Sequence, residues 1–336
     1  MITIPTKISA PPASLIKIRA TVGTEWTQLN EMIKSGLSRD DRHPMISEIV
    51  DHMTKNSGKR LRPLLGMLIA KTFANNEPIN ELSIQLACII ELIHTATLLH
   101  DDVIDNSLLR RSQSSANAIW GNHAPILVGD YIYSIAVELL LKTDNKEIML
   151  LIAPAITRLV EGEIMQMSNT KKYNKKQYFE TIYRKTAILF EIMSQCTAIS
   201  NHGSLEQTEA SKSFGCNLGL AFQVVDDILD YTACSDTLGK NIGDDLKQGK
   251  ITLPLIHALD RISTREKTAI LKKIESDSIN LEEIQELINR TDAAQQSYQH
   301  AEHYHQIALE QLVHLPQNKY TDQLRNLIEF NRHRVK

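Results

Sequence analysis

The sequence contains few residues that interrupt helices and few that favour strands. Among its 336 residues are 13 glycines and 10 prolines, and aromatic residues make up only 5% of the chain. Segments that alternate between apolar and polar residues, the pattern of a half-buried strand, are hard to find between turn residues. These scarcities argue against an α/β sandwich and favour a protein built from helices.

The cysteines and the charge balance exclude further classes. The four cysteines, Cys88, Cys196, Cys216 and Cys234, are far apart and form no CxxC pair, so neither a zinc site nor a disulfide framework is indicated. Such cysteines fit a reducing cytoplasm. A net charge of −3 gives no hint of the basic face that nucleic-acid binding needs. The sequence also lacks a GxxxxGK[ST] loop, which argues against a P-loop nucleotide site.

No unbroken apolar run has the length of a membrane span. The longest extends from Ile148 to Ile156, whereas a spanning helix needs about 18 apolar residues or more. The N-terminal segment also lacks the apolar core of a signal peptide. We therefore expect a cytoplasmic protein without stable membrane insertion, although its ligands need not be water-soluble.

Apolar residues recur at helical spacing through most of the chain. From Leu82 to Thr97 they follow i, i+3, i+4, i+7 spacing, and similar spacing predicts long helices over 124–141, 146–168, 176–201, 206–231 and 292–312. No Pro/Gly/Ser-rich linker separates these segments. The pattern indicates a single all-α domain over residues 1–336, built as a bundle of long helices. A poorly ordered segment, if there is one, is expected at residues 1–20.

Two acidic clusters stand at the ends of two apolar helical stripes. The first is HDDVID at 100–105 and the second is VDDILD at 225–230. On a helix Asp101 and Asp105 share one face, as do Asp226 and Asp230, with Cβ atoms roughly 5–6 Å apart. Like charges at this spacing repel by a few tenths of a kcal/mol, and a bound cation is the obvious group to offset that cost.

Carboxylate oxygens are hard ligands that suit Mg²⁺. Mg²⁺ takes one or two carboxylates, keeps several waters and binds substrate phosphates, and it seldom sits in an all-protein cage. Paired acids on opposite walls of a cavity therefore predict a ligand that carries phosphate or diphosphate. The alternative is two solvated helix ends without a role, and the repetition of the cluster argues against it.

Basic residues near these clusters are candidates for binding such a phosphate group. GKRLRP at 58–63 precedes an apolar helix, Arg110 and Arg111 follow the first cluster, and RKTA occupies 184–187. Arginine binds phosphate bidentately, and lysine acts as a point charge. Taken singly, each of these residues is more often a solvated surface charge, so only their combination indicates a site.

Taken in order, GKRLRP, HTATLLHDDVID with LLRR, RKTA, FQVVDDILDY and GKNIGDDLKQGKITLPL resemble the trans-isoprenyl diphosphate synthases. The resemblance is close over residues 50–260 and is strongest to the long-chain members, which make octaprenyl diphosphate and similar products. It implies an isoprenoid synthase fold, a helical bundle around a deep central apolar cavity, usually as a homodimer. The implied reaction is Mg²⁺-dependent 1′-4 condensation of isopentenyl diphosphate with an allylic diphosphate, here farnesyl diphosphate. The resemblance also implies about three Mg²⁺ ions per substrate-bound site. It further implies a forty-carbon product that is delivered to the membrane for use as a quinone side chain.

The resemblance also implies roles for individual residues. The Mg²⁺ ligands that it implies are Asp101, Asp105, Asp226 and Asp230, supported by Asp102 and Asp227. The isopentenyl diphosphate pocket matches Lys59, Arg62, His94 and Arg111. The allylic diphosphate side matches Arg110, Lys185, Thr186, Gln223, Lys240 and Lys250, of which Lys185 and Lys240 are expected to be catalytic together with the four Mg²⁺ ligands.

Product length in this family depends on the side chains below the first acidic cluster. Bulky aromatic residues four and five positions before the first aspartate block the tunnel, and here those positions hold Thr97 and Ala96. The resemblance therefore implies a deep tunnel past Ala96, Thr97 and Ile93, with a floor near Val137 and Leu140. The alternative is that the small residues only permit close helix packing.

Three other functions stay open. A short-chain synthase that makes fifteen- or twenty-carbon products would differ only in tunnel depth. A non-catalytic partner subunit would normally have lost an acidic cluster, and both clusters are intact here. An HD-type phosphohydrolase would hold a transition metal with His94, His100 and Asp101, but this reading leaves the second cluster unexplained. His100 is also compatible with a packing role.

Overall fold

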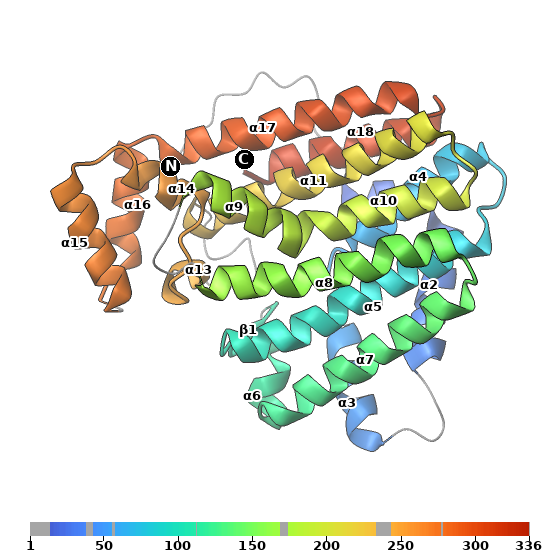
Figure 1. Ribbon diagram of the computed structural model, residues 1–336, viewed down its shortest axis with the longest axis horizontal. Helices are drawn as coiled ribbons and strands as arrows, with labels where there is room; N and C mark the ends of the chain where they lie inside the picture. Colours follow the sequence, from blue (N-terminus) through green and yellow to red (C-terminus); the bar gives the residue numbers. More distant parts are fainter. Residues whose placement is uncertain are drawn as a thin grey trace.

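The structure is a computed structural model that describes residues 14–37, 43–55, 58–111, 113–168, 174–232, 243–276 and 278–335. Helices make up almost all of the described chain, and one short β-hairpin interrupts them (Figure 1). The expectation of an all-α protein is confirmed.

The first part of the chain forms eight helices and the hairpin. Their bounds are α1 Leu15–Ala20, α2 Gly23–Leu37, α3 Pro44–Lys55, α4 Leu61–Ala74, α5 Glu81–Ile104, β1 Leu109–Arg110, β2 Gln113–Ser114, α6 Ala116–Trp120, α7 His123–Lys142 and α8 Lys146–Ser168. The antiparallel pairing of β1 with β2 fixes the chain just after the first acidic cluster.

The second part of the chain forms the remaining helices. Their bounds are α9 Lys175–Ile182, the π-helical turn η2 Tyr183–Ala187, α10 Ile188–Ser200, α11 Leu205–Thr232, α13 Asp244–Lys247, α14 Leu253–Leu259, α15 Thr264–Glu275, α16 Leu281–Arg290, α17 Ala293–Gln311, η3 Leu312–His314, α18 Lys319–Arg332 and η4 His333–Val335. A π-helical turn inside a longer helix is rare and often marks a functional site.

Most of the helices predicted from periodicity are present within a few residues of their expected ends. Segments 124–141, 146–168, 206–231 and 292–312 correspond to α7, α8, α11 and α17. The expected helix 176–201 is divided into α9, η2 and α10 by the π-helical turn. Within the segment for which poor order was expected, residues 15–20 form α1, where Ser14 caps the helix and Ile18 is buried. Residues 1–13 lie outside the described part.

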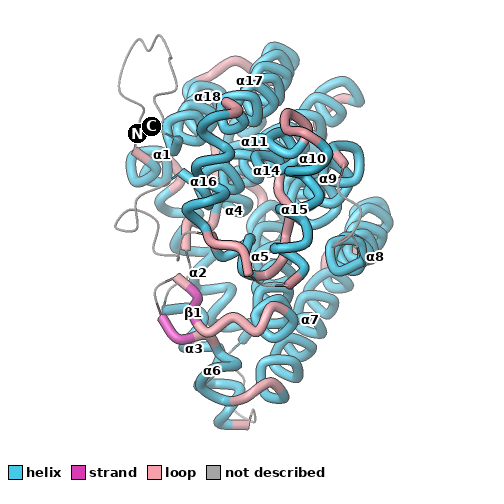
Figure 2. Tube along the Cα trace, turned by 90° about the vertical axis from the view of Figure 1, so that its left-hand side faces the viewer, coloured by secondary structure: helices cyan, strands magenta, loops and turns pink. Residues whose placement is uncertain are grey.

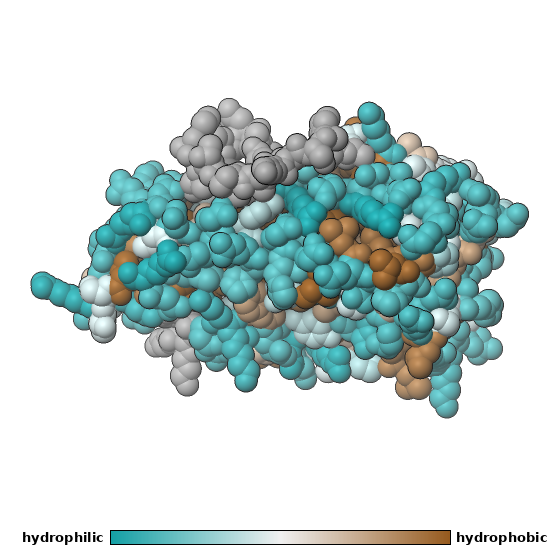
Figure 3. All heavy atoms as spheres, turned by 90° about the horizontal axis from the view of Figure 1, so that it is seen from above, coloured by the Kyte–Doolittle hydropathy of each residue, from teal (hydrophilic) through white to brown (hydrophobic). Residues whose placement is uncertain are grey.

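The long helices lie side by side, with α10 and α11 packed together inside the bundle (Figures 1 and 2). One group of buried apolar residues joins α4, α5, α7, α8 and α10. A second group joins α11 to α14, α16 and α17. Seen from the side of α17 and α18, the surface is mostly hydrophilic, with apolar residues showing between polar ones (Figure 3).

Two helices, α5 and α7, are long and apolar enough to cross a membrane by length and composition alone. The lengths of the unbroken apolar runs in the sequence did not predict these two helices as candidates. In α5, 67% of the apolar window is buried inside the protein, which is what a core helix shows; in α7 only 44% is buried. The apolar residues of α5 therefore belong to the core, and α7 keeps an apolar surface that the described residues leave exposed.

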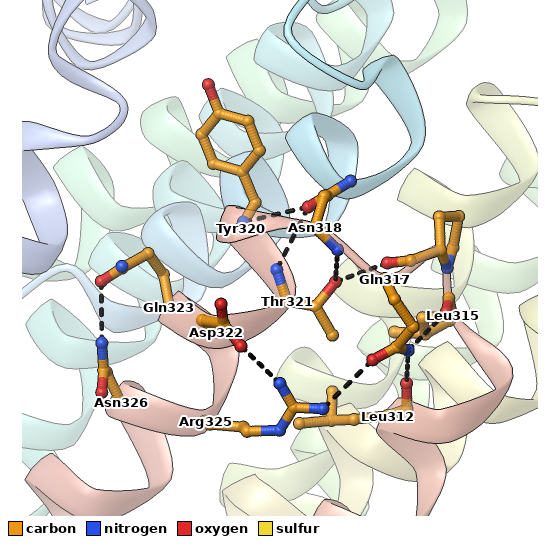
Figure 4. A network of polar contacts seen from close by, with 11 residues as sticks. Leu312, Leu315, Gln317, Asn318, Tyr320, Thr321, Asp322, Gln323, Arg325 and Asn326 are labelled. Carbon is orange, nitrogen blue, oxygen red and sulfur yellow. Dashed lines mark hydrogen bonds and ion pairs between the residues drawn. The ribbon is translucent and has the colours of Figure 1, made fainter.

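A polar network at the start of α18 fixes the C-terminal segment (Figure 4). The Asn318 side chain accepts hydrogen bonds from the backbone N–H groups of Tyr320 and Thr321, and the Asn318 N–H donates to Thr321 Oγ1, which completes a capping box. Its Nδ2 also donates to the carbonyl of Thr72 at 2.9 Å, which ties α18 to α4. This anchoring directs the end of the chain, including Arg334, toward the interior of the bundle.

The contact between α10 and α11 depends on a missing side chain at Gly215. A Cβ there would overlap the carbonyl oxygen of Phe190 and the hydroxyl of Ser194. We predict that Gly215→Ala lowers the free energy of unfolding by about 1–3 kcal/mol, because helix backbone would have to shift. Urea unfolding followed by circular dichroism measures this.

Gly66 provides a matched control for that substitution. A Cβ at Gly66 would meet only the flexible end of Met193, and alanine gains up to about 1 kcal/mol of helix propensity over glycine. We expect Gly66→Ala to leave the stability almost unchanged. Equal losses in the two variants would contradict the proposed backbone conflict at Gly215.

Candidate active site

A cavity of about 1150 Å³ opens between α5, α8 and α11. The first turn of α4, the π-helical turn and the segment around α13 complete its wall. Elements from almost the whole length of the chain therefore meet at one hollow. Both acidic clusters, the GKRLRP segment and the RKTA segment contribute to its lining, as expected from their order in the sequence.

The first acidic cluster divides its carboxylates between the cavity and the protein interior. Asp101 and Asp105 line the cavity from the last turn of α5. Asp102 is fully buried and receives two hydrogen bonds from Arg110, from Nε at 2.6 Å and from Nη2 at 2.5 Å. Asp102 therefore holds Arg110 in place at the cavity wall, which agrees with its expected supporting role.

The second cluster repeats this division on α11. Asp226 and Asp230 line the cavity, and Asp227 is almost fully buried. The Asp227 carboxylate accepts hydrogen bonds from the Tyr178 hydroxyl at 2.6 Å and from Gln223 Nε2 at 2.7 Å. Burial raises the pKa of Asp227 well above its usual value, and these hydrogen bonds oppose that rise. Asp227 thus joins α11 to α9.

Gln223 continues this hydrogen-bond chain toward the π-helical turn. Its Oε1 accepts a hydrogen bond from the Thr186 hydroxyl at 2.7 Å. Thr186 and Gln223, both predicted on the allylic side, are therefore direct partners at the cavity wall. The amide of Gln223 orients both its neighbours, because its oxygen faces Thr186 and its nitrogen faces Asp227.

Basic side chains compensate the cavity-facing carboxylates. Lys250 Nζ lies 2.8 Å from Asp105, and Lys185 Nζ lies 3.8 Å from Asp101. Arg334, close to the C-terminus, forms an ion pair with Asp226, and its guanidinium lies over the ring of Phe222. A metal cation bound at these carboxylates would compete with Lys185, Lys250 and Arg334 for them, and the released basic side chains could then bind an anion.

Electrostatics at Asp101 show how closely the charges are packed. Burial raises the pKa of Asp101 to about 6, while Lys185 lowers it and Glu163 and Asp105 raise it further. For Lys185, burial lowers the pKa, but Asp101 and Glu163 outweigh this and raise it above its usual value. The ammonium therefore stays charged, and it is close to two carboxylates.

A short segment after α11 bridges the two acidic clusters. The backbone N–H of Asp245 donates to the Asp230 carboxylate at 3.3 Å, and the N–H of Gly243 donates to the Asp230 carbonyl at 2.9 Å. A few residues further on, Lys250 reaches Asp105. The ends of α5 and α11 are thus fixed relative to each other. Lys240, predicted on the allylic side, lies outside the described residues.

The donor set at this end of the cavity fits Mg²⁺. Asp101, Asp105, Asp226 and Asp230 offer hard carboxylate oxygens from two helices, and all four line the same cavity. Within the described ranges, no three His, Cys, Asp or Glu side chains gather closely enough to hold a metal by themselves. That spacing matches an ion that completes its coordination with water and substrate phosphates.

The predicted isopentenyl diphosphate residues come together at the start of α4 and the middle of α5. Lys59, Arg62, His94 and Arg111 all line the cavity. Burial lowers the pKa of Arg62 to about 10, and burial together with Arg62 and Arg111 holds the pKa of His94 well below its usual value. His94 is therefore neutral and able to donate one hydrogen bond to an anion.

Glu91 is a buried carboxylate among these arginines that sequence reasoning missed. Its Oε1 lies 3.5 Å from Arg60 Nε, and burial raises its pKa to about 6 while Arg60, Arg62 and Arg111 lower it. One carboxylate faces three guanidinium groups, so the pocket keeps an excess of positive charge. That excess suits a diphosphate.

Of the five residues expected to form the chain-length tunnel, only Thr97 lines the cavity. Ala96 and Ile93 are buried in the apolar core beneath it, and Leu140 is buried on α7. Val137, also expected near the floor, is 43% exposed on α7 of the single chain. These four residues thus lie in the helix packing or at the surface, and their role in product length stays a prediction.

The two histidines of the phosphohydrolase alternative have separate surroundings. His94 lies among the arginines, whereas His100 packs on Gly129 and its Nε2 lies 3.1 Å from the Ile126 carbonyl of α7. The structure therefore does not support an HD-type metal site, and it agrees with a packing role for His100.

Several functional neighbours were not predicted from the sequence. Each reaches the cavity from a distant element, and none stands next to a recognised motif. These residues are Glu91, Glu163, Gln166, Tyr178 and Arg334; Asp245, also missed, lies inside the GKNIGDDLKQGKITLPL segment. A search for polar residues inside apolar helical stripes would have found Glu91, and nothing local distinguishes the others.

Comparison with known proteins agrees with this geometry. Residues 43–291 match the polyprenyl synthetase family. The chain is 36% identical to octaprenyl diphosphate synthase of Haemophilus influenzae, over 94% of this chain and 95% of that protein. It is also 36% identical to all-trans-nonaprenyl-diphosphate synthase (geranyl-diphosphate specific) of Rhodobacter capsulatus, over 92% and 95% of the two chains.

A solved structure gives the same result for the fold. The polyprenyl synthase of Caulobacter crescentus, complexed with calcium and isoprenyl diphosphate, superposes with a TM-score of 0.90 at 33% identity, covering 98% of this chain and 99% of that one. The fold is therefore that of the isoprenoid synthases. The chain belongs to the polyprenyl synthetase family, and it is a prenyltransferase of the long-chain trans-polyprenyl diphosphate synthase kind.

Proposed function

We propose that this protein makes a forty-carbon octaprenyl diphosphate by adding isopentenyl diphosphate repeatedly to farnesyl diphosphate, in 1′-4 linkage and in trans. The observation that carries the proposal is one cavity lined by two carboxylate pairs and, beside them, by an arginine-rich pocket. One part suits an allylic diphosphate with Mg²⁺, and the other suits a second diphosphate. A quinone side chain is the proposed use of the product.

The residues of the chain divide the work between the two substrates. Bound at Asp101, Asp105, Asp226 and Asp230, Mg²⁺ would supply Lewis-acid stabilisation of the departing allylic diphosphate. Lys185, Lys250 and Arg110 add preorganised positive charge on the same side. Arg62, Arg111 and His94 hold isopentenyl diphosphate so that its double bond can attack the allylic cation. The proton lost afterwards passes to the released diphosphate.

The apolar part of the cavity protects the reaction from water. Thr97, Leu159, Phe190 and Phe222 line it without offering a nucleophile. A carbocation in such surroundings meets the isopentenyl double bond before it meets water. The same lining accommodates the growing isoprenoid chain, which then leaves for the membrane, and the unpaired cysteines Cys88, Cys196 and Cys216 suit a cytoplasmic enzyme.

The first test is incubation of the purified protein with Mg²⁺, farnesyl diphosphate and labelled isopentenyl diphosphate, followed by mass analysis of the products. Asp101→Ala and Asp226→Ala are each expected to lower kcat at least about a thousandfold, because charge stabilisation of the leaving group is lost. Asp51→Ala, at an exposed carboxylate of α3, is the matched control. Near-full activity in either active-site variant with Mg²⁺ would rule out the metal assignment.

Product length tests the specificity half of the proposal. Thr97 lines the cavity below Asp101, so Thr97→Tyr should fill the path of the growing chain and shorten the main product toward fifteen or twenty carbons. Ala96→Tyr enters the packed core instead and is expected to act partly through lost stability. An unchanged product length with Thr97→Tyr would show that the chain grows in another direction.

We further propose that a second copy of the chain covers the exposed apolar side of α7 and α8, which run along one side of the bundle (Figure 2). Leu127 and Leu141 share one face of α7 and are 68% and 62% exposed, and Ile164 on α8 is 57% exposed. Apolar patches of this kind on a soluble chain mark interaction sites.

Analytical ultracentrifugation tests the dimer. The unmodified chain should sediment as a dimer at micromolar concentration, and Leu127→Asp combined with Leu141→Asp should shift it to monomer, because buried charges at an apolar interface cost several kcal/mol. Leu205→Asp, at an 81% exposed leucine at the start of α11, controls for the added charge. A monomeric unmodified chain would remove this part of the proposal.

A further inference from the structure

Lys185 is held in the cavity by two side chains of α8. Its Nζ donates to Glu163 Oε2 at 2.5 Å and to Gln166 Oε1 at 2.8 Å. The same nitrogen lies 3.8 Å from Asp101 Oδ2, which is too long for a hydrogen bond. The side chain of Glu163 is only 14% exposed, so this ion pair belongs to the cavity wall. The ammonium thus stands beside the metal-site carboxylate without engaging it closely.

The local sequence explains why the π-helical turn and α8 come so close. Gly162 stands directly before Glu163, and a Cβ there would lie 2.8 Å from the Cβ of Arg184 and 3.1 Å from the backbone nitrogen of Lys185. Only glycine leaves room for the turn at this distance. Glu163 can therefore reach Lys185 with a short side chain in an enclosed position.

A second ion pair beside this one has a different setting. Glu161 pairs with Arg184 on the outer side of Gly162, where the Glu161 side chain is 50% exposed. Arg184 also donates to Glu180 at 2.6 Å, so it keeps a partner if Glu161 is removed. Neither Glu161 nor Arg184 lines the cavity. The two pairs provide a natural comparison between an enclosed contact and an exposed one.

We propose that Glu163 is a positioning residue for Lys185: it draws the ammonium away from Asp101 and directs it to the place where the allylic diphosphate binds. Lysine has a flexible four-carbon stem, so without Glu163 the ammonium shortens its long 3.8 Å ion pair with Asp101 to hydrogen-bonding distance. In that close contact the Lys185 ammonium would no longer reach the diphosphate, and the Asp101 carboxylate would no longer be available to the metal. The inference rests on the proposed function.

A double-mutant cycle on Glu163 and Lys185 tests the proposal. The measured quantity is the Kd of farnesyl thiodiphosphate, a slowly ionising allylic analogue, by titration calorimetry in the presence of Mg²⁺. Glu163→Ala is expected to raise this Kd roughly tenfold, and Lys185→Ala should cost much less in the Glu163→Ala background than in the unmodified chain. The KM of isopentenyl diphosphate should stay constant in Glu163→Ala.

Two further variants make the result specific. Glu163→Gln keeps an oxygen that accepts from Lys185 but loses the charge. Its Kd for farnesyl thiodiphosphate should therefore fall between those of the unmodified chain and Glu163→Ala. If Glu163→Ala does not fold, Glu163→Gln replaces it in the cycle. Glu161→Gln should leave the Kd unchanged, because the outer pair does not reach the cavity. Circular dichroism confirms folding of every variant.

Additive losses, within about a factor of two, would overturn the positioning role, because uncoupled residues behave additively. An equal loss in Glu161→Gln would overturn it too, since the effect would then lie in the packing of α8. If the unmodified chain neither binds the analogue nor transfers a prenyl group, the proposed function itself fails. If the unmodified chain binds the analogue and transfers a prenyl group but the cycle is additive, only the positioning role of Glu163 fails and the proposed function stands.

Discussion

The site is organised around carboxylates that face one another across a largely apolar cavity. Bringing like charges into surroundings with little water is costly unless opposite charges lie close by. The raised pKa of Asp101 records that cost, and Lys185, Lys250 and Arg334 offset it from three different elements. On the proposed function, the basic side chains that would bind the substrate diphosphate are ion-paired here with the carboxylates that would bind Mg²⁺.

Contacts between helices hold the carboxylates and basic side chains of the cavity in fixed relative positions. The two buried aspartates fix neighbouring elements: Asp102, outside the cavity lining, binds Arg110, and Asp227, at the cavity wall, accepts from Tyr178 and Gln223. A DDxxD sequence therefore has two uses on one helix, since its first and last acids face the ligand and its second anchors the wall. Lys185 and Thr186 lie in the π-helical turn, whose extra residue changes the direction of the following side chains, and both line the cavity wall.

The sequence allowed the helices and the acidic pairs to be predicted because both depend on periodicity within one element. Asp101 with Asp105, and Asp226 with Asp230, needed only the geometry of a helix. The roles of the basic residues came from a resemblance to a family, since a lone lysine such as Lys185 looks like any surface charge. Partners such as Glu163, Tyr178 and Arg334 depend on contacts between distant segments. No local pattern determines such contacts.

A side chain's distance below the aspartates does not determine which way it points, so the sequence alone does not place the tunnel residues. Ala96, Ile93 and Leu140 are buried in the apolar core where α5 and α7 pack together, and of the expected tunnel residues only Thr97 lines the cavity. On the proposed function, a chain that grows past Thr97 would have to open this packing. Burying the five carbons of one isoprene unit is worth about 4 kcal/mol, whereas overpacking a core costs about 1–3 kcal/mol. Each added unit can therefore open the space that it occupies, until the next group in its path is too large or too firmly held to move. On the proposed function, the small side chains of Ala96 and Thr97 would make the first of these steps easy, and the first obstacle beyond them would limit product length.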